Sequence, residues 1–461
     1  MDDASRRSVT LAGGQGMYGD DVPSVSRLLD ERIDYLCLEA LAELTVSILA
    51  KDRGRDESLG YTKDLGQYLS LALPAVADRG LRVITNAGGV NPVAAGRLAV
   101  EVARTQGLSG LKIATVVGDD LTAQIDSLDR ELGLINVDDG RRWRDHVDDL
   151  VFANAYLGAR PIVDALEQGA DVVITGRVAD PCLFLAPLVH EFGWAWDDYD
   201  RLACGIAVGH LSECGGQSTG GNFSGDWWTI EQPWNWAYPI VECDADGSAV
   251  LRKAAGVGGR VDFDTVRHQL LYEVHDPAAY LTPDVVADFT SIRLEEVDQD
   301  RVRISGATGR TATPTYKALA ATALGWAAES RVAVSWPDAH AKAQAIAQVF
   351  RKRVAIAGLT VDAWHEEYWG VNALHGSTVP LKDDDDAPEV MLRVAWRCRD
   401  RRTAERIGRQ MPPIGLSGPA WGVNGTGKGM IGSASQHLEL WPILIDKGHV
   451  DAGVRVQVET V

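Results

Sequence analysis

Short apolar runs alternate with amphipathic stretches through about the first 200 residues, and this alternation most constrains the fold. Five of these runs pass directly into Gly, Asp or Asn: SVTLAG, IDYLCLEA, LRVITNAGG, LKIATVVGDD and DVVITGRVADP. Strands that alternate with helices form a largely parallel sheet, and ligands bind outside the carboxyl ends of such strands. The sequence therefore predicts an α/β domain in which five strand ends outline a pocket.

The remainder of the chain has a different pattern. Beyond about residue 245, strand-like runs such as EVMLRVAWRC mix with helical runs such as AHAKAQAIAQVFRKRVA. A length of 461 residues is also more than one hydrophobic core usually serves. We expect an α/β domain with an N-terminal largely parallel sheet and flanking helices over residues 1–245, followed by an α+β domain over 246–461.

Composition excludes several classes of partner. The net charge of −20 argues against sequence-independent binding to nucleic acid or to an anionic membrane, because both depend on excess Lys and Arg. The N-terminus lacks the apolar core of a secretory signal, and no apolar run has the length of a membrane span. The six cysteines form no C-x-x-C pair, so we expect a reduced, cytoplasmic protein.

Two sites of helix initiation follow the predicted strands. Asn91 can cap a helix whose first residue is Pro92, and Gly107 supplies a left-handed stop. Asp180 and Pro181 repeat that arrangement.

A glycine-rich stretch after the first strand has the spacing of a dinucleotide fingerprint. Gly14, Gly16 and Gly19 fit G-x-G-x-x-G, and Glu39 lies where an acidic residue would contact the ribose.

The residues that follow argue against this fingerprint. Asp20, Asp21 and Pro23 prevent a helix from starting at the glycines, and two carboxylates would repel a pyrophosphate. We expect a turn that brings Asp20 or Asp21, and Glu39 with them, to the pocket; a purely structural turn is the alternative.

A second nucleotide-like motif, GVNGTGKGM, has the spacing of a phosphate loop but has glycine after Lys428 where magnesium binding needs Ser or Thr. Two interpretations stay open: Lys428 contacts an anionic substrate, or the segment is a plain loop.

Two other strand ends carry candidate binding residues. Asn86, Gly88 and Gly89 follow the third predicted strand, and Arg177 follows the fifth, three residues before Asp180. An arginine offers a planar fork of donors for a carboxylate or a phosphate. Alternatively, Arg177 and Asp180 form an ion pair that only fixes the turn.

The segment GHLSECGGQSTGGNF has the highest density of reactive side chains. On a helix that ends at Gly215, His210 and Glu213 share a face, and a histidine beside a carboxylate is a usable acid–base pair. Gln217 follows as a candidate substrate contact. The pair could instead belong to a structural polar network or supply two metal ligands, although no convincing further ligands stand out.

Two further segments are candidates for function. QLLYEVHDPAAYLTPD places His275, Asp276 and Tyr280 close together around two prolines, which an ordinary connecting loop seldom does, so His275 and Tyr280 are candidates. Alternatively, Asp276 before a proline is a good helix cap. The Trp-rich segment 227–236 could be buried in the second domain or in a subunit interface.

Taken together, DYLCLEALAELT, TNAGGVNP, TGRVADPCLFLAPLVHEFGW, GHLSECGGQSTGGNF and YEVHDPAAYLTPDVVADFT resemble the acyclic terpene utilisation protein A (AtuA) family from about residue 8 to about residue 455. The resemblance implies a cytoplasmic protein of catabolic or biosynthetic gene clusters, whose namesake is associated with degradation of citronellol and geraniol as coenzyme A thioesters. It implies no agreed reaction. In some relatives a small extra domain accompanies this core, and we expect a small partner subunit to supply it here.

We expect a lyase of the hydro-lyase type that adds or removes water, or cleaves a bond, next to the activated carbonyl of a small carboxylate or acyl-CoA thioester. In this scheme His210, Glu213 and His275 move protons, while Arg177 and the glycine-loop amides hold the carbonyl oxygen. A non-catalytic ligand-binding or scaffold subunit and a metal-dependent hydrolase stay open as alternatives. We expect a homo-oligomer without a resident cofactor, with coenzyme A only as part of the substrate.

Overall fold

The computed structural model describes residues 8–146, 149–378, 387–419 and 432–461. The helices within these residues are α1 (Val25–Leu29), α2 (Glu43–Arg55), α3 (Leu65–Arg79), α4 (Pro92–Thr105), α5 (Ile125–Leu132), α6 (Trp143–His146), α7 (Arg160–Glu167), α8 (Cys182–Phe192), α9 (Tyr199–Ser212), α10 (Phe263–Leu270), α11 (Ala339–Ile356), α12 (Arg401–Gly408), α13 (Ile414–Ser417) and α14 (Lys447–Asp451), with short 3-10 turns η1 (Val22–Ser24), η2 (Gln217–Thr219), η3 (Trp227–Thr229) and η4 (Gly376–Thr378). The strands are β1 (Ser8–Gln15), β2 (Tyr35–Leu38), β3 (Arg82–Thr85), β4 (Lys112–Val117), β5 (Leu150–Ala155), β6 (Val172–Thr175), β7 (Pro239–Asp244), β8 (Ala249–Lys253), β9 (Tyr280–Leu281), β10 (Val286–Asp288), β11 (Arg293–Asp298), β12 (Arg301–Ser305), β13 (Thr308–Arg310), β14 (Thr315–Ser335), β15 (Ala363–Trp369), β16 (Glu389–Cys398), β17 (Ser435–Asp446) and β18 (Arg455–Thr460).

The chain divides into two compact units, Met1–Ala320 with Trp441–Val461 and Ala321–Leu440. This division differs from the boundary expected at residue 245. The physical reason is strand pairing: β8, β11 and β12 extend the sheet of the first unit, and the C-terminal β18 pairs with β4 in the same sheet. Two segments after residue 245, one on each side of the second unit in the sequence, therefore belong to the first unit.

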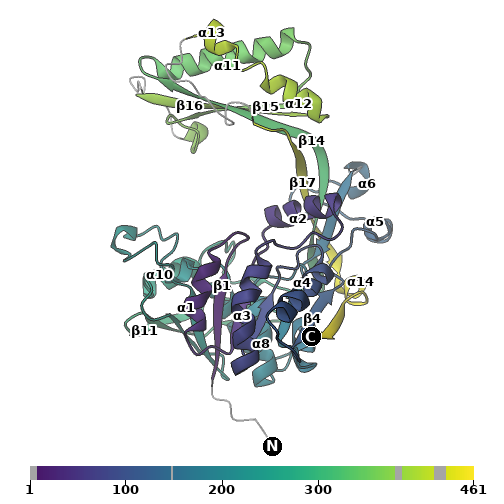
Figure 1. The fold of residues 1–461 in the computed structure, drawn as a ribbon, viewed down its shortest axis with the longest axis vertical. Coiled ribbons are helices and arrows are strands. Elements are labelled where there is room, and N and C mark those ends of the chain that lie inside the picture. The colour runs from purple at the N-terminus through teal and green to yellow at the C-terminus, as the bar shows by residue number, and fades with distance from the viewer. Residues whose placement is uncertain (1–7, 147–148, 379–386, 420–431) are drawn as a thin grey trace, which may run out of the picture. The chain divides into compact units, whose positions relative to one another are not determined.

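The main sheet of the first unit has the order β11-β12-β8-β7-β1-β2-β3-β6-β4-β18 (Figure 1). Its centre, from β1 to β4, is parallel throughout. These are the five strands that the apolar runs predicted, so the expected largely parallel sheet is confirmed. The strands outside this centre pair antiparallel.

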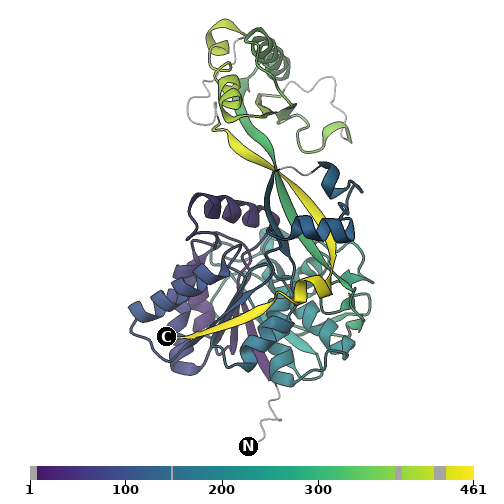
Figure 2. The same cartoon turned by 90° about the vertical axis from the view of Figure 1, so that its right-hand side faces the viewer.

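Successive residues of the central strands supply two separate cores, because side chains alternate between the faces of a sheet. Leu36 and Leu38 of β2 pack in a cluster with α1, α3 and α4. Tyr35 and Cys37 of the same strand belong to a second cluster with α7, α8 and α9. Helices accordingly cover both faces of the sheet, as Figure 2 shows.

The two predicted helix starts have different outcomes. The helix after β3 begins as expected: the side chain of Asn91 accepts a hydrogen bond from the Ala94 nitrogen, Pro92 opens α4, and Gly107 adopts φ +70°. The prediction that Asp180 caps the next helix is wrong. Helix α8 begins at Cys182 without a side-chain cap, because the Asp180 carboxylate pairs with Arg177 instead.

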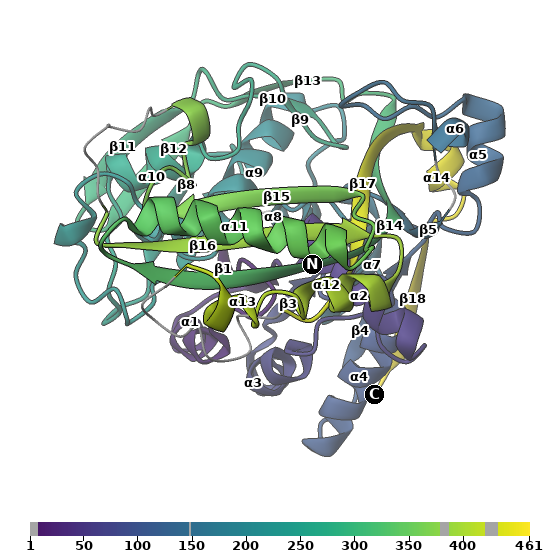
Figure 3. The ribbon, with the colours of Figure 1, turned by 90° about the horizontal axis from the view of Figure 1, so that it is seen from above.

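The second unit has the α+β character that the sequence predicted. Its sheet has the order β15-β16-β14-β17, and β16 pairs antiparallel with both β15 and β14 (Figure 3). Helices α11 and α12 lie against β16. Phe350 of α11 and Trp396 of β16 are both buried in the shared core. No helix in the described part of the chain combines the length and apolar character that a membrane span requires.

A close backbone approach connects this fold to the candidate site. In β1, a Cβ atom built on Gly13 would lie 2.3 Å from the Ser212 carbonyl oxygen at the end of α9. We expect Gly13→Ala to lower the free energy of unfolding by about 1–3 kcal/mol, the usual cost of overpacking a rigid contact. Urea denaturation followed by circular dichroism measures this change.

Gly54→Ala is the matched control, since Gly54 lies in helix α2 and a Cβ there meets nothing within 4 Å. Alanine should raise the stability by about 0.5–1 kcal/mol through its higher helix propensity. Equal effects of the two substitutions would contradict the close approach.

Candidate functional site

An open cavity of about 1570 Å³ lies at the carboxyl ends of the central strands, and all of its lining residues belong to the first unit. The loops after β1, β2 and β6 contribute to it, together with the end of α9 and the segment up to Tyr238. Ligands of α/β proteins bind at such strand ends. A cavity is therefore present at the strand ends where the sequence predicted a pocket.

Arg177, at the end of β6, lies at the buried floor of this cavity and is 4% exposed. Its Nη1 lies 3.2 Å from Oδ1 of Asp180 and donates to the Leu41 carbonyl, while its guanidinium carbon lies 4.1 Å from the centre of the Tyr156 ring. Its Nε has no hydrogen-bond partner among the described residues. The ion pair that the sequence left open as an alternative is present, and one buried donor of the guanidinium has no partner in the described part of the chain.

Asp119, at the end of β4, fixes the backbone beside Arg177. Its Oδ2 accepts from the Arg177 nitrogen at 2.8 Å and from Nδ2 of Asn154 at 2.9 Å. Burial raises the pKa of Asp119 to about 6, while these hydrogen bonds oppose the rise. The position of Arg177 thus depends on three neighbouring strand ends.

Glu39, after β2, is a second buried carboxyl group in the cavity lining. Its Oε1 accepts from the Leu41 nitrogen at 2.6 Å and from Nδ2 of Asn86 at 3.0 Å. Burial, followed by the negative charge of Asp180, raises the pKa of Glu39 to about 8, against the opposing effect of Arg177. Glu39 is therefore mainly protonated at neutral pH.

Glu213 and His210 lie together at the end of α9, with His210 Nδ1 3.4 Å from Glu213 Oε1. Only Glu213 lines the cavity, and its Oε2 has no hydrogen-bond partner among the described residues. Burial, with the charges of Asp180 and Glu273, raises its pKa well above the ordinary value. Burial also lowers the pKa of His210 to about 4, so the histidine beside this carboxyl group is neutral at pH 7.

A polar group beside Arg177 was not predicted from the sequence. The Tyr156 hydroxyl donates to Oε1 of Glu43 at 2.9 Å, and Lys317 Nζ lies 3.4 Å from the same oxygen. Lys317 and Arg177 both lie against the Tyr156 ring, and all of them line the cavity. No local motif marks these residues; only the position of Tyr156 directly after β5 could have indicated a strand end.

The glycine-rich turn after β1 reaches the cavity, as one of its two interpretations predicted. Asp20 Oδ2 accepts from the Gly16 nitrogen at 2.9 Å, and Asp20 Oδ1 accepts from the Tyr238 hydroxyl at 2.5 Å. Asp20 and Asp21 both line the cavity. A Cβ atom on Gly16 would lie 2.2 Å from the nitrogen of Gly215, so the glycine permits contact with the loop after α9.

The Trp-rich segment forms the exposed edge of the cavity. Trp227, Trp228, Trp234 and Trp236 line it and are between 54% and 75% exposed. We call these four side chains the aromatic rim. They are not buried in the core of the first unit.

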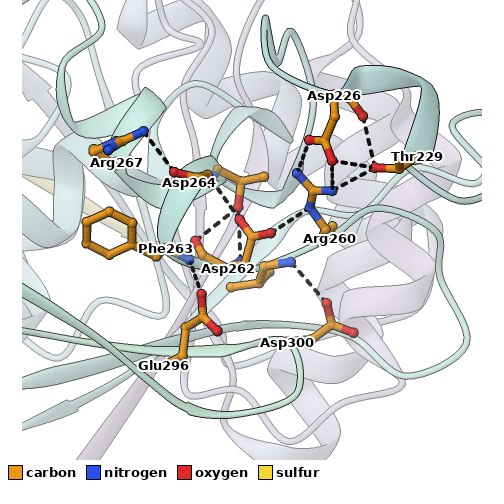
Figure 4. Close-up of polar contacts among 11 residues, drawn as sticks. Asp226, Thr229, Arg260, Asp262, Phe263, Asp264, Arg267, Glu296 and Asp300 are labelled. Atoms are coloured by element: carbon orange, nitrogen blue, oxygen red, sulfur yellow. Dashed lines mark hydrogen bonds and ion pairs between the residues drawn. The ribbon is translucent and has the colours of Figure 1, made fainter.

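Polar contacts hold the segment that carries the aromatic rim (Figure 4). Arg260 Nη2 lies 2.8 Å from Oδ1 of Asp226, and its Nη1 donates to Oγ1 of Thr229 at 2.7 Å. The Gly259 nitrogen donates to the Glu231 carbonyl. The segment therefore has a defined conformation at the cavity edge.

The other predicted site residues fall into two groups. Gln217 lines the cavity. Asn86 does not, but its Nδ2 donates to the lining residue Glu39. The remaining residues lie outside its lining. Gly14 packs on Leu36, Gly88 packs on Thr175 and Gly89 packs on Leu49. Tyr280 stacks on Phe289 and contacts His210, and His275 is exposed in a bend of the chain. Lys428 lies outside the described residues.

The described residues contain neither a cluster of metal ligands nor a disulfide bond. Within the described ranges, no group of three or more His, Cys, Asp or Glu side chains is arranged to hold a metal ion. All six cysteines are free.

Glu39→Gln should change the pH dependence of stability. The unfolded chain loses the Glu39 proton near about pH 4.3, whereas the folded protein keeps it until about pH 8. The folded state binds the extra proton in this window, so wild-type stability falls as pH rises through it. Glutamine stays neutral and its oxygen can accept the same bonds from Leu41 and Asn86.

The stability of Glu39→Gln minus that of the wild type should rise by about 2–4 kcal/mol from about pH 5 to about pH 8. The free energy of unfolding in urea, measured for both proteins at both pH values, gives this change. Glu101→Gln on the exposed face of α4 is the control and should show no such difference. Parallel pH profiles of the wild type and Glu39→Gln would contradict a protonated Glu39.

Comparison with known proteins assigns the chain to a family. The model of the acyclic terpene utilisation family protein AtuA matches residues 9–456, which is nearly the whole chain. No curated protein and no solved structure matches it. The resemblance noted in the sequence is confirmed, and the chain belongs to the AtuA family.

Proposed function

We propose that this protein is an enzyme of the lyase type that adds or removes water, or cleaves a bond, next to the carbonyl group of a small carboxylic acid or related compound. One observation carries the proposal. Glu39, Asp180 and Glu213 line one cavity around Arg177, and burial raises the pKa of all three. Carboxyl groups whose pKa values are set apart by different environments are suited to act as a paired acid and base.

The surroundings of Glu213 and Asp180 favour different roles. Glu213 lines the cavity and has a raised pKa, and a carboxyl group that retains its proton to higher pH suits a general acid. Asp180 is paired with Arg177, whose charge opposes the rise in its pKa, and its side chain is 30% exposed. Asp180 therefore suits the base that removes a proton next to a carbonyl.

Two cationic groups can stabilise the negative charge that develops on the carbonyl oxygen. Arg177 lines the cavity, and Lys317 Nζ lies 4.7 Å from the centre of the neighbouring Tyr156 ring with half of its side chain exposed. Donors already fixed before the reaction stabilise an enolate most effectively. In a dehydration, Asp180 would take the proton from the carbon next to the carbonyl, Glu213 would protonate the departing hydroxyl group, and a carbon–carbon double bond and water would form.

The charge of the lining favours a small substrate over a coenzyme A thioester. Asp20, Asp21, Glu43 and Glu273 also line the cavity and are less buried than Glu39 and Glu213, and the described lining has only Arg177 and Lys317 as cationic side chains. The phosphates of coenzyme A would be repelled by these carboxylates.

Glu213→Gln tests the acid role. The purified protein is incubated in deuterium oxide with a panel of hydroxycarboxylic acids and their unsaturated counterparts, and solvent exchange and product formation are followed by nuclear magnetic resonance. We expect turnover by the wild type and a loss of about 100-fold or more in the variant, because glutamine keeps the shape of a protonated glutamate but cannot transfer the proton.

Glu101→Gln is again the control, since Glu101 lies on the exposed face of α4 away from the cavity lining. Full activity of Glu213→Gln would contradict the acid role. Tight binding of panel members without turnover by the wild type would favour the alternative of a non-catalytic ligand-binding subunit.

A further inference from the structure

The cavity is unusually rich in exposed tryptophan and in carboxyl groups at its outer part. The four side chains of the aromatic rim line the same space as Asp20, Asp21, Glu43 and Glu273, which we call the acidic rim. Exposed apolar patches of this kind mark interaction sites, because water does not favour them. The proposed acid–base groups on the buried floor leave both rims without a role.

We propose that the two rims form a binding site for an organic cation, so that the substrate carries a positively charged nitrogen group, such as a quaternary ammonium, beside its carbonyl. The face of a tryptophan ring is negative and attracts cations more strongly than other aromatic side chains do. This inference names the substrate class of the cavity and rests on the proposed function for the carbonyl end of the substrate only.

The electrostatics of the lining support a cation. Burial raises the pKa of Glu39 and Glu213, and five other carboxyl groups of the described lining lie beside the two cationic side chains Arg177 and Lys317. Each of these cations already has a carboxylate partner, Asp180 for Arg177 and Glu43 for Lys317. The excess negative charge favours a cationic ligand over a neutral or anionic one.

The arrangement of the rims also supports a small ligand. Trp227 and Trp228 meet edge to face with ring centroids 5.8 Å apart, so their faces point in different directions. Arg260 holds their segment through Asp226 and Thr229, and Tyr238 holds Asp20. A concave site with fixed aromatic walls and a few polar groups has the properties of a small-molecule site.

The buried floor adds a second, independent sign of a ligand. Glu213 is 8% exposed, lines the same cavity, and leaves Oε2 without a partner within the described part of the chain. Buried polar atoms in proteins are nearly always hydrogen-bonded. Oε2 is therefore a candidate contact for the carbonyl end of the substrate at the floor, separate from the cation at the rims.

Isothermal titration calorimetry with choline tests the proposal, and 3,3-dimethylbutan-1-ol is the neutral molecule of the same shape. We expect choline to bind at least about 10-fold more tightly than its isostere, and its affinity to fall as salt is added. Coenzyme A, as an anionic probe, should not compete with choline. Equal affinity for the two isosteres, no binding of choline in the millimolar range, or competition by coenzyme A would overturn the proposal.

Variants locate the site. We expect the double variant Trp228→Ala/Trp234→Ala to bind choline about 3- to 30-fold more weakly, and Glu273→Gln to show a smaller loss with a weaker salt dependence. The control is Trp369→Ala, which removes a tryptophan that is 45% exposed in the second unit. Unchanged affinity in the double variant would overturn the proposal, and so would self-association of the wild type that the double variant abolishes, because the rim would then be a protein interface.

The same titration on Glu213→Gln separates this proposal from the proposed function. Choline binding should persist in that variant, since the rims do not depend on proton transfer. Choline binding without turnover of any panel compound would overturn the proposed function alone. If the wild-type protein turns over carbonyl compounds but does not bind choline, only the proposed cation site is overturned.

Discussion

The buried guanidinium of Arg177 is the interaction on which the rest of the site depends. It binds the Leu41 carbonyl after β2, pairs with Asp180 after β6, and lies against Tyr156 after β5. A buried charge is tolerated only with such partners, because its transfer from water costs several kcal/mol. Three loops that are distant in sequence are therefore held around one cation. Burial raises the pKa of the carboxyl groups beside it, against the opposing effect of that charge.

The sequence predicted the framework of this site well. The five central strands and helix α4 are encoded by short runs with local signals: apolar residues bounded by Gly, Asp or Asn, and a cap at Asn91 followed by proline. Parallel strands place their carboxyl ends at one edge, so Glu39, Arg177 and Asp180 could be brought to one pocket without knowledge of the structure.

The remaining parts depend on contacts between distant residues. Lys317 and Tyr156 are far apart in the chain and meet Glu43 only because β5 pairs with β14. The domain boundary expected at residue 245 could not include the antiparallel strands that extend the first sheet, since an antiparallel strand has no sequence signal for the sheet it joins. His210 has the correct spacing from Glu213, yet spacing cannot show that one side chain faces the core and the other the cavity.

The contact between Gly16 and Gly215 has a mechanical consequence. The two backbones approach so closely that a Cβ atom on Gly16 would lie 2.2 Å from the Gly215 nitrogen. One loop carries Asp20 and the other follows Glu213, and both residues line the cavity. A ligand that pushes either loop towards the other would bring their backbones into collision, so we expect the two loops to respond to occupancy together.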